Sequence, residues 1–524
     1  MGYSAHQIAT VHECSEMWMQ GSSRLVLGID AGTTSVKTVA FDLDGAIVSV
    51  ARSSVHIQRD GNGGAEVEMD HVWDAAVTTL TAVADAVGDA EIVAIGVTGQ
   101  GDGAWLVDDE GRPLRPAALW LDGRAHRRVE QWQSSGKAAA VQEVTGSPLF
   151  AGALPVLLEE LFEDDERLRP SLGHHLNCKD WLRYRLTGQI ATDPSDASRT
   201  YLDTGSGRYS ESLLTDLGQS DVRDHLPDVR EPQAIAGHLD ARVAKTLGLP
   251  AGVPIVTGLV DTAAAGVGLG AVGDGQGYAI LGTTGFVGVN HRTRAEVRSG
   301  VSIVLSTGRG TQVLEALAPM TGTPNLDWVR EVLGRTGSSW SDIEADAAAV
   351  PPGAGGVLFL PYGSPSGERA PFFDAAASAS WLGMTVTTTA GDLLRSVYEG
   401  LAYALTECLQ ALGLDGHLLV CGGGSESDLL CAILADVSGH AVIRQDEPEV
   451  GARGVATLAL VGIGMEPDLD SAAARLAPAT SRFSPDPGRH ALYRETYQRF
   501  RTVRDALRPQ WPTLRELRSL SDRP

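Results

Sequence analysis

The pattern that most constrains the fold is a short motif that occurs twice along the chain. The first copy reads LVLGIDAGTTSVKTVAFD over residues 25–42, and the second reads YAILGTTGFVGV over residues 278–289. In both copies a Gly-Thr-Thr turn joins two apolar runs, which predicts a β-hairpin whose tip exposes backbone amides and hydroxyls. Two hairpins with the same tip indicate a duplicated domain whose copies face each other.

The surrounding sequence predicts an α/β architecture with two cores. A chain of 524 residues is long enough to form two or more hydrophobic cores. The alanine-rich stretch at 72–87 predicts a helix, the apolar run at 91–97 a buried strand, and residues 390–412 a long helix. Residues 127–247 are mostly helical in their period, which is typical of an insertion on the substrate side.

A glycine-rich segment, GLGAVGDGQG, predicts the domain boundary near residue 272. We therefore expect four parts: an N-terminal extension over residues 1–24, a first domain over 25–271, a second domain over 272–480 and a helical tail over 481–524.

Charge and cysteine content exclude several classes of protein. The chain has 42 basic and 66 acidic residues, a net charge of −24, which argues against a nucleic-acid partner because such binding needs clustered Lys and Arg. Its five cysteines form no Cys-x-x-Cys pair, as expected for free thiols in a reducing compartment. No apolar run is long enough to cross a membrane, and the N-terminus lacks the pattern of a secretory signal. We expect a cytoplasmic protein with no membrane partner.

Three turns rich in glycine and hydroxyl groups predict a nucleotide site. Each turn alone has a structural explanation, but glycine lets the backbone approach an anion closely, while amides and hydroxyls donate to phosphate oxygens. Lys37, one of only four lysines, lies beside the first turn. An acidic protein can therefore hold a polyphosphate through neutral dipoles and a metal ion. The turn residues are Gly32, Thr33 and Thr34; Gly282, Thr283 and Thr284; and Gly423, Gly424 and Ser425.

Two aspartates at the ends of strands are candidates for the reaction chemistry. Asp30 ends the first strand, where a carboxylate can hold Mg²⁺ directly or through water. Asp261 follows a Thr-Gly-Leu-Val segment and could accept a proton from a substrate hydroxyl. Asp261 could equally be the N-cap of the helix that follows, and the two roles are compatible.

Polar and aromatic residues gathered between positions 100 and 124 are typical of a polyol or sugar site. Hydrogen-bonding groups beside aromatic faces suit a ligand with hydroxyls and C–H edges. Individually, Arg124 could be a surface ion-pair partner and Trp120 a core residue. The candidate substrate residues in this segment are Gln100, Asp102, Trp105, Trp120, Asp122 and Arg124.

From Leu25 to Ile463 the chain resembles the FGGY family of carbohydrate kinases, through five ordered motifs: GIDAGTTSVKTVAFD, GLVDTAAAGVGLG, LGTTGF, APFFD with WLGMTVTTTAGDLLRSVYEGLAYAL, and CGGGSESDLL. A sixth is CKDWLRYRLTG followed by TDPSDAS. The resemblance implies two actin-like, ribonuclease-H-like ATPase domains with a central cleft. It also implies ATP and Mg²⁺ as cofactors and leaves a homodimer open.

The resemblance also assigns roles to residues. It implies that Asp261 is the catalytic base and, with Asp30, a metal ligand, and that Phe286 approaches the substrate. The implied ATP-binding residues are Gly32, Thr33, Thr34, Lys37, Gly282, Thr283, Thr284, Gly322, Gly423, Gly424, Ser425 and Asp428. Around Gly322 the spacing of TGTPNLDW departs by about one residue from the pattern of the family's glycerol kinases.

The segment Gln100-Gly101-Asp102 indicates the substrate class. The family's glycerol kinases carry Gln-Arg-Glu there and its xylulokinases Gln-Met-His, so Gly101 removes a bulky side chain and leaves more room. The run TGQGDGAWLVDDEG, followed by ALWLDGRA, is most similar to the erythritol and L-xylulose kinase branch. We expect ATP-dependent phosphorylation of a terminal hydroxyl of a small polyol or ketose, with a tetritol such as erythritol favoured. L-Xylulose, D-xylulose and glycerol stay open as substrates, and a nucleotide-gated sugar-binding regulator or an actin-like ATPase as other classes.

Overall fold

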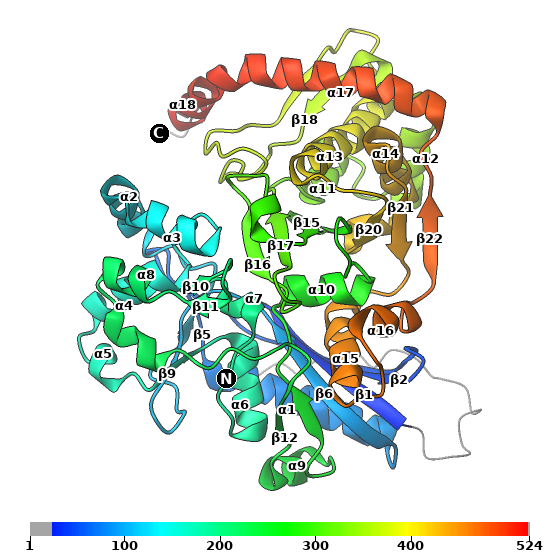
Figure 1. The fold of residues 1–524 in the computed structure, drawn as a ribbon. Coiled ribbons are helices and arrows are strands. Elements are labelled where there is room, and N and C mark those ends of the chain that lie inside the picture. The colour runs from blue at the N-terminus through cyan, green and yellow to red at the C-terminus, as the bar shows by residue number, and fades with distance from the viewer. Residues whose placement is uncertain (1–23, 522–524) are drawn as a thin grey trace, which may run out of the picture.

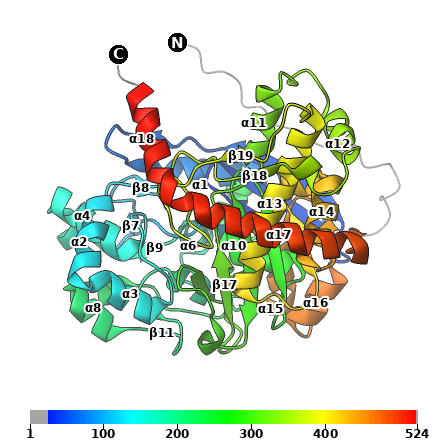
Figure 2. The same cartoon turned by 90° about the horizontal axis from the view of Figure 1, so that it is seen from above.

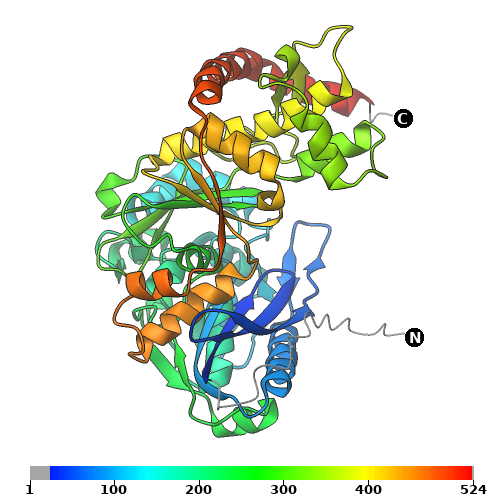
Figure 3. The same cartoon turned by 90° about the vertical axis from the view of Figure 1, so that its right-hand side faces the viewer.

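A computed structural model describes residues 24–521 of the chain. The predicted extension over 1–24 therefore lies, except for Arg24, outside the described residues. The chain builds two large sheets, one above the other in Figure 1, each with helices packed against it. Figure 3 shows the same two halves stacked from the side. No helix of the described part is both long and apolar enough to traverse a bilayer.

The first sheet contains the first predicted hairpin, β1 and β2. Here β1 pairs antiparallel with β2 and parallel with β6, while β2 and β3 pair antiparallel, as do β12 and β13. The predicted strand over 91–97 is confirmed as part of β6. In spatial order the strands are β12 (Ile235–His238), β13 (Pro254–Val256), β6 (Glu91–Gly99), β1 (Arg24–Ala31), β2 (Ser35–Asp42) and β3 (Ile47–Ser54).

The second sheet repeats this arrangement around the second predicted hairpin, β14 and β15. Again the hairpin is antiparallel, its first strand pairs parallel with a later strand, and the far edge ends in an antiparallel pair. The predicted duplication is confirmed by this shared sequence of strand directions. In spatial order the strands are β16 (Ile303–Ser306), β17 (Val313–Leu317), β15 (Gly285–His291), β14 (Gly277–Leu281), β20 (Leu418–Cys421), β21 (Val442–Gln445) and β22 (Thr480–Phe483).

The expected helical tail is part of this second half. Residue 481 lies inside β22, which completes the second sheet as β12 completes the first. The helices that follow, α17 (Pro487–Leu507) and α18 (Trp511–Ser521), run across the second half in Figure 2. Tyr493, Phe500 and Trp511 are buried in its core. The apolar side chains on one face of the tail thus explain why the second domain extends beyond residue 480.

Two helices lie between the sheets and join the halves. α10 (Asp261–Leu269) packs against α15 (Val450–Gly462), and α15 comes from late in the chain but packs on β1 and β6 of the first sheet. Glycines permit this close packing: a Cβ atom on Gly28 would lie 2.2 Å from the Ala452 carbonyl oxygen, and one on Gly96 2.1 Å from that of Val455.

The remaining helices cover the outer faces and build the insertion. α1 packs on β2 and β3 and includes the helix predicted over 72–87, and α13 matches the prediction over 390–412, with a capping box between Thr389 and Asp392 at its start. The helices are α1 (Met69–Val87), α2 (His126–Ser135), α3 (Lys137–Thr145), α4 (Leu154–Asp164), α5 (Leu168–Ser171), α6 (Cys178–Thr187), α7 (Pro194–Ala197), α8 (Glu211–Leu217), α9 (Ala241–Leu247), α11 (Pro324–Val332), α12 (Trp340–Ala348), α13 (Ala390–Leu412), α14 (Asp428–Ser438) and α16 (Leu469–Arg475).

Short strands and turns complete the fold. The insertion predicted as mostly helical also contributes β12 to the edge of the first sheet. The short strands are β4 (Gln58–Arg59), β5 (Ala65–Val67), β7 (Trp105–Val107), β8 (Ala117–Ala118), β9 (His174–Leu176), β10 (Leu202–Asp203), β11 (Arg208–Tyr209), β18 (Leu358–Leu360) and β19 (Ser380–Leu382). The 3₁₀ turns are Ser220–His225, Arg294–Glu296, Ala354–Gly356, Gly423–Glu426 and Arg508–Gln510.

Candidate active site

Two partly buried aspartates mark the centre of the site. Asp30 lies near the end of β1, where the strand pairing places it opposite Lys37 on β2 and beside Thr98 on β6. Asp261 is the first residue of α10, directly after Val260, which bridges to Gly99 at the end of β6. Neighbouring strand ends therefore bring together two carboxylates that are far apart in the sequence.

The surroundings of these carboxylates raise both pKa values. Burial raises the pKa of Asp261 to about 7, with a further contribution from the negative charge of Asp30. Burial also raises the pKa of Asp30 to about 6, although Lys37 acts in the opposite direction. A carboxyl group with a pKa near neutrality is suited to exchanging a proton with a substrate hydroxyl.

The same pair is a suitable place for a divalent cation. Within residues 24–521, no three His, Cys, Asp or Glu side chains are grouped so that they alone could hold a metal ion. Mg²⁺ usually takes one or two carboxylates, with phosphate oxygens and water as its other ligands. Asp30 and Asp261 fit that donor set, because a cation beside them would offset the cost of holding two negative charges out of water.

The loop before Asp261 is held by hydrogen bonds on both sides. The Thr98 hydroxyl donates to the Leu259 carbonyl oxygen at 2.7 Å, and the Val260 N–H donates to Ser195 Oγ at 3.0 Å. The N-cap position of α10 is Val260, while the Asp261 carboxylate accepts only from the neighbouring Thr262 N–H, at 2.6 Å. The alternative in which Asp261 is the N-cap is therefore wrong, because the helix begins at Asp261 itself.

The first Gly-Thr-Thr turn lies next to the predicted substrate segment. Trp120 Nε1 donates to Thr33 Oγ1 at 3.1 Å, and the Trp120 side chain is 36% exposed, so it is not the core residue of the alternative prediction. Gly32 and Thr33 are partly buried and Thr34 is exposed. Lys37 is not free beside this turn, because its Nζ forms an ion pair with Glu449 at 2.8 Å.

Gln100 and Asp102 lie on the loop that follows β6. Gln100 is buried, and no group within residues 24–521 forms a hydrogen bond with its Oε1. Asp102 adopts a left-handed backbone conformation, with φ of 57°, and its charge contributes to the raised pKa of Asp261. Arg199 Nε donates to both oxygens of Asp102, at 3.1 and 3.2 Å. Arg199 was not predicted; it follows the TDPSDAS motif directly, and only that proximity could have indicated it.

Gly101 is required where it stands. A Cβ atom at this position would lie 2.6 Å from Val260 Cγ2 and 3.3 Å from Asp196 Oδ1. Because Gly101 has no side chain, the loop that follows β6 can pack directly on the loop that precedes Asp261. Phe286 on β15 packs against Tyr278 in a tilted arrangement, with ring centroids 5.7 Å apart, and the Tyr278 hydroxyl donates to the Thr262 carbonyl oxygen at 2.6 Å.

The structure differs from the prediction at Asp122 and Arg124. Asp122 is fully buried and accepts from the backbone of Ala65 and from the backbone and guanidinium of Arg124. Arg124 also pairs with Glu66. Because both carboxylate oxygens are used within the protein, this pair anchors β5 and offers the substrate no free acceptor. Trp105 is likewise a fully buried core residue.

The other two glycine turns meet at one end of the second sheet. Thr283 and Thr284 are exposed at the tip of the β14–β15 hairpin. The Thr323 N–H donates to the Gly282 carbonyl oxygen at 2.9 Å, and a Cβ atom on Gly322 would lie 2.4 Å from the carbonyl oxygen of Thr283. A Cβ atom on Gly424 would lie 2.8 Å from the Thr323 side chain. Segments around residues 282, 322 and 424 therefore form one surface.

A pocket of about 530 Å³ opens beside this surface. Of the residues predicted to bind ATP, Gly423, Gly424 and Asp428 line it, whereas Ser425 is buried and its hydroxyl donates to the Gly422 carbonyl oxygen at 2.7 Å. Several residues in the wall of this pocket were not predicted. The Ser339-x-x-Asp342 capping box could have predicted the start of α12, the helix that carries some of them. These residues are Thr323, Leu326, Asp327, Trp340, Ser341, Glu344, Tyr398, Glu426 and Ser427.

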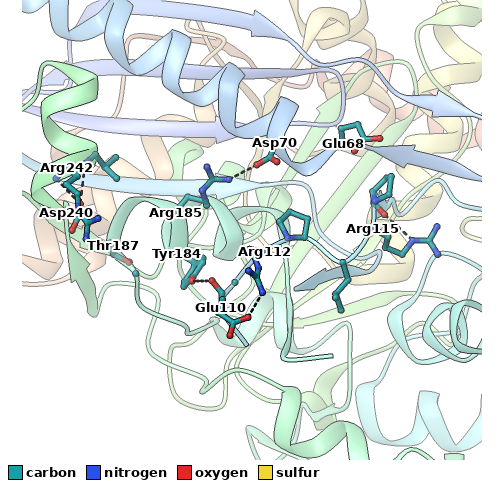
Figure 4. A pocket seen from close by; sticks show the side chains of 16 residues that line it. Glu68, Asp70, Glu110, Arg112, Arg115, Tyr184, Arg185, Thr187, Asp240 and Arg242 are labelled. Carbon is teal, nitrogen blue, oxygen red and sulfur yellow. Dashed lines mark hydrogen bonds and ion pairs between the residues drawn. The ribbon is translucent and has the colours of Figure 1, made fainter. Parts of the chain in front are cut away.

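A larger pocket, about 800 Å³, lies in the first half, and none of the predicted site residues lines it. Figure 4 shows ion pairs between some of its charged side chains, whereas Glu68 is drawn without a partner. Arg185 contacts Asp70 at 2.8 Å, and Arg112 contacts Glu110 at 2.6 Å. These two pairs compensate four of the charges that line the pocket.

Comparison with known proteins agrees with this geometry. The FGGY family of carbohydrate kinases matches through its N-terminal domain over residues 25–268 and its C-terminal domain over 277–463. Erythritol kinase of Brucella abortus is 32% identical, over 95% of this chain and 99% of that protein. Xylulose kinase of Escherichia coli is 31% identical, over 93% of this chain and 99% of that protein.

The fold itself has solved counterparts. The crystal structure of gluconate kinase from Lactobacillus acidophilus superposes with a TM-score of 0.88 at 23% identity, covering 94% of this chain and all of that one. The expected pair of actin-like domains is therefore confirmed. With both family domains matched in order along most of its length, the chain belongs to the FGGY family of carbohydrate kinases.

Proposed function

We propose that this kinase transfers the γ-phosphoryl group of ATP to a terminal hydroxyl of a small neutral polyol, with erythritol as the first candidate. Support for this substrate comes from the 32% identity to erythritol kinase of Brucella abortus and from the Gln100-Gly101-Asp102 segment. A pentulose is the second candidate, because xylulose kinase of Escherichia coli is 31% identical.

The observation that carries the proposal is the position and protonation of Asp261. A carboxyl with a pKa of about 7 is substantially ionised at neutral pH and can accept the proton of a substrate hydroxyl at one of its oxygens. As that O–H bond breaks, the alcohol oxygen forms a bond to the γ-phosphorus, and the bond from this phosphorus to the bridging β–γ oxygen breaks to release ADP. Asp261 keeps the proton until the product leaves.

The charges around Asp102 favour a neutral substrate over a sugar acid. Arg199 is paired with Asp102, so its positive charge is already compensated before any substrate binds. A substrate carboxylate would then be repelled by Asp102, while the neighbouring guanidinium of Arg199 is already engaged by that residue. Substrate hydroxyls, in contrast, can donate to Asp102 and to the unpartnered Oε1 of Gln100.

The pocket beside Gly423 and Gly424 is the proposed nucleoside site. Its volume of about 530 Å³ is adequate for a nucleoside, and Trp340 offers an exposed ring. The exposed Thr283 and Thr284 would meet the phosphates from one side and the first Gly-Thr-Thr turn from the other. Mg²⁺, held by Asp30 with Asp261, would supply neutralisation of the phosphate charge.

A panel of acceptors tests the substrate assignment. ADP release is measured with erythritol, L-xylulose, D-xylulose, glycerol and gluconate, each with and without the acceptor. We expect the highest kcat/KM for erythritol and the lowest for gluconate. A higher value for a pentulose would replace the tetritol assignment, and a high value for gluconate would overturn the argument from the Asp102–Arg199 pair. Binding of acceptors without turnover would favour a sugar-binding regulator.

A further inference from the structure

A cluster of buried charges lies beneath the site, built from the sixth sequence motif. Lys179 Nζ contacts three carboxylates: Asp180 at 2.6 Å, Asp193 at 2.9 Å and Asp196 at 3.1 Å. All four side chains are inaccessible to solvent. Burying such a cluster carries a large desolvation penalty, which indicates that these charges do more than fill space.

The ammonium group of Lys179 stays charged in this setting. Burial alone would lower its pKa, but the three carboxylates outweigh that effect and raise it. Arg183 shares Asp180, at 3.3 Å. Asp193 therefore keeps a fixed cation on its Oδ1, which leaves Oδ2 to accept other hydrogen bonds.

From Asp193 a chain of hydrogen bonds leads to the loop of Asp261. Asp193 Oδ2 accepts from the Ser195 hydroxyl at 2.6 Å and from the Ser195 N–H at 2.7 Å. Ser195 Oγ in turn accepts from the N–H of Val260 at 3.0 Å. This hydrogen bond holds the Leu259–Val260 peptide, and Val260 is the residue bonded directly to Asp261, so the backbone is fixed one residue before the base.

The direction of these hydrogen bonds is determined by the backbone. Because the Val260 N–H can only donate, Ser195 Oγ must accept there, and its own proton then points toward Asp193 Oδ2. We infer that Ser195 is a positioning residue for the Asp261 carboxylate, oriented by Asp193 and Lys179. This inference rests on the proposed role of Asp261 as the base. A misplacement of about 1 Å at a reacting group can cost 10²-fold in rate.

Ser147 provides a matched control elsewhere in the chain. Its buried hydroxyl also accepts from a backbone N–H, that of Val304, at 2.9 Å. Val304 lies on β16, on which none of the proposed site residues is located. Ser195→Ala and Ser147→Ala thus remove the same kind of hydrogen bond, one on the loop of the base and one away from it.

The experiment measures kcat, KM for polyol and ATP, and Tm for both variants. We expect Ser195→Ala to lower kcat at least about 10-fold with both KM values within about twofold of wild type, and Ser147→Ala to leave kcat unchanged. Ser195→Thr, which keeps the hydroxyl, should recover most of kcat. If Ser195→Ala does not fold, Ser195→Cys takes its place with the same criteria, since sulfur is only a weak acceptor.

Asp261→Asn separates this inference from the proposed function. If the base acts through the position that Ser195 sets, Ser195→Ala should not lower the residual turnover of Asp261→Asn any further. Wild-type kcat in folded Ser195→Ala, beside an inactive Asp261→Asn, would overturn the positioning role alone. Near wild-type turnover in Asp261→Asn would instead reject the base itself.

Discussion

At the residue scale, burial of the Asp261 carboxyl group suits its proposed role as the base but lowers the stability of the folded protein. The pKa of Asp261 is about 7 because burial and the neighbouring Asp30 disfavour its ionised form. The chain retains this unfavourable group at the point where the strands of the first sheet end. That combination is typical of functional sites, where local stability is given up for chemistry.

The activity should depend on pH through this residue. Only ionised Asp261 can accept the hydroxyl proton, so kcat/KM for the polyol should fall as the pH drops through about 7. Well below that value we expect a loss of about tenfold per pH unit. Initial rates from pH 5 to 9 check this, and a flat profile down to pH 5 would contradict it.

The free energy of unfolding should change with pH in the opposite sense to the activity, again because of Asp261. The pKa of Asp261 in the folded protein lies above its ordinary value of 3.8. The buried charge therefore does not destabilise the fold below about pH 4, destabilises it increasingly between pH 4 and 7, and has its full effect above pH 7. Asn cannot ionise and keeps the acceptor for Thr262 N–H. We expect Asp261→Asn to have a higher Tm than wild type at pH 8, by about 1 °C or more, with a smaller difference at pH 5. A lower Tm at pH 8 would be the contrary result.

Asp102 should be a determinant of substrate affinity. Loss of one charged hydrogen bond costs about 1.5 to 3 kcal/mol, so Asp102→Ala should raise KM for the polyol by about 10- to 150-fold. KM for ATP should not change, because the proposed nucleoside pocket lies beside the second sheet. Steady-state titration of each substrate checks this, and an unchanged polyol KM would remove Asp102 from the site.

At the scale of elements, the hairpins and long helices could be predicted from sequence, but their partners could not. The spacing of apolar residues and the turn residues predict β1–β2, β14–β15 and α13, because these signals lie within short stretches of the sequence. The burial of Asp122 and the pairing of Lys37 with Glu449 depend on segments distant in sequence. The walls of the nucleoside pocket on α12 were missed for the same reason. Local pattern indicated the site's strands and turns, while tertiary contacts decide which side chains remain free.

The contact between α15 and the first sheet should tolerate no side chain at its glycines. A Cβ atom on Gly96 would lie 2.1 Å from a backbone oxygen, which cannot move without shifting α15. We expect Gly96→Ala to destabilise the protein by about 2 kcal/mol or more. Gly61→Ala, where nothing lies within 4 Å of the new methyl group, is the control and should be neutral. Denaturant unfolding of both variants compares them, and equal stabilities would contradict the packing argument.

At the scale of the whole molecule, the repeated sheet suggests how an acidic chain could hold the proposed polyphosphate ligand. The net charge of −24 argues against a large basic surface as the source of affinity, and the one lysine beside the first turn is paired with Glu449. Each copy of the duplicated sheet contributes a hairpin whose tip carries neutral donors instead. The predicted two cores thus correspond to two donor sets, one on each sheet, with Asp30 and Asp261 near the ends of strands in the first half.

The proposed Mg²⁺ site at Asp30 and Asp261 predicts that turnover depends on a divalent cation. Chelation with EDTA should lower product formation by about 100-fold or more, and added Mg²⁺ should restore it. Product should be followed directly by ³¹P NMR, since coupling enzymes also need the metal. Full turnover in EDTA would contradict the role assigned to Asp30.

The most direct test of the account is the turnover of Asp261→Asn with erythritol and ATP, measured as phosphorylated product in protein shown to be folded by its Tm. The account predicts that this variant keeps its fold and loses at least about 10²-fold in kcat, with the KM for ATP unchanged. Near wild-type turnover in the folded variant would contradict it.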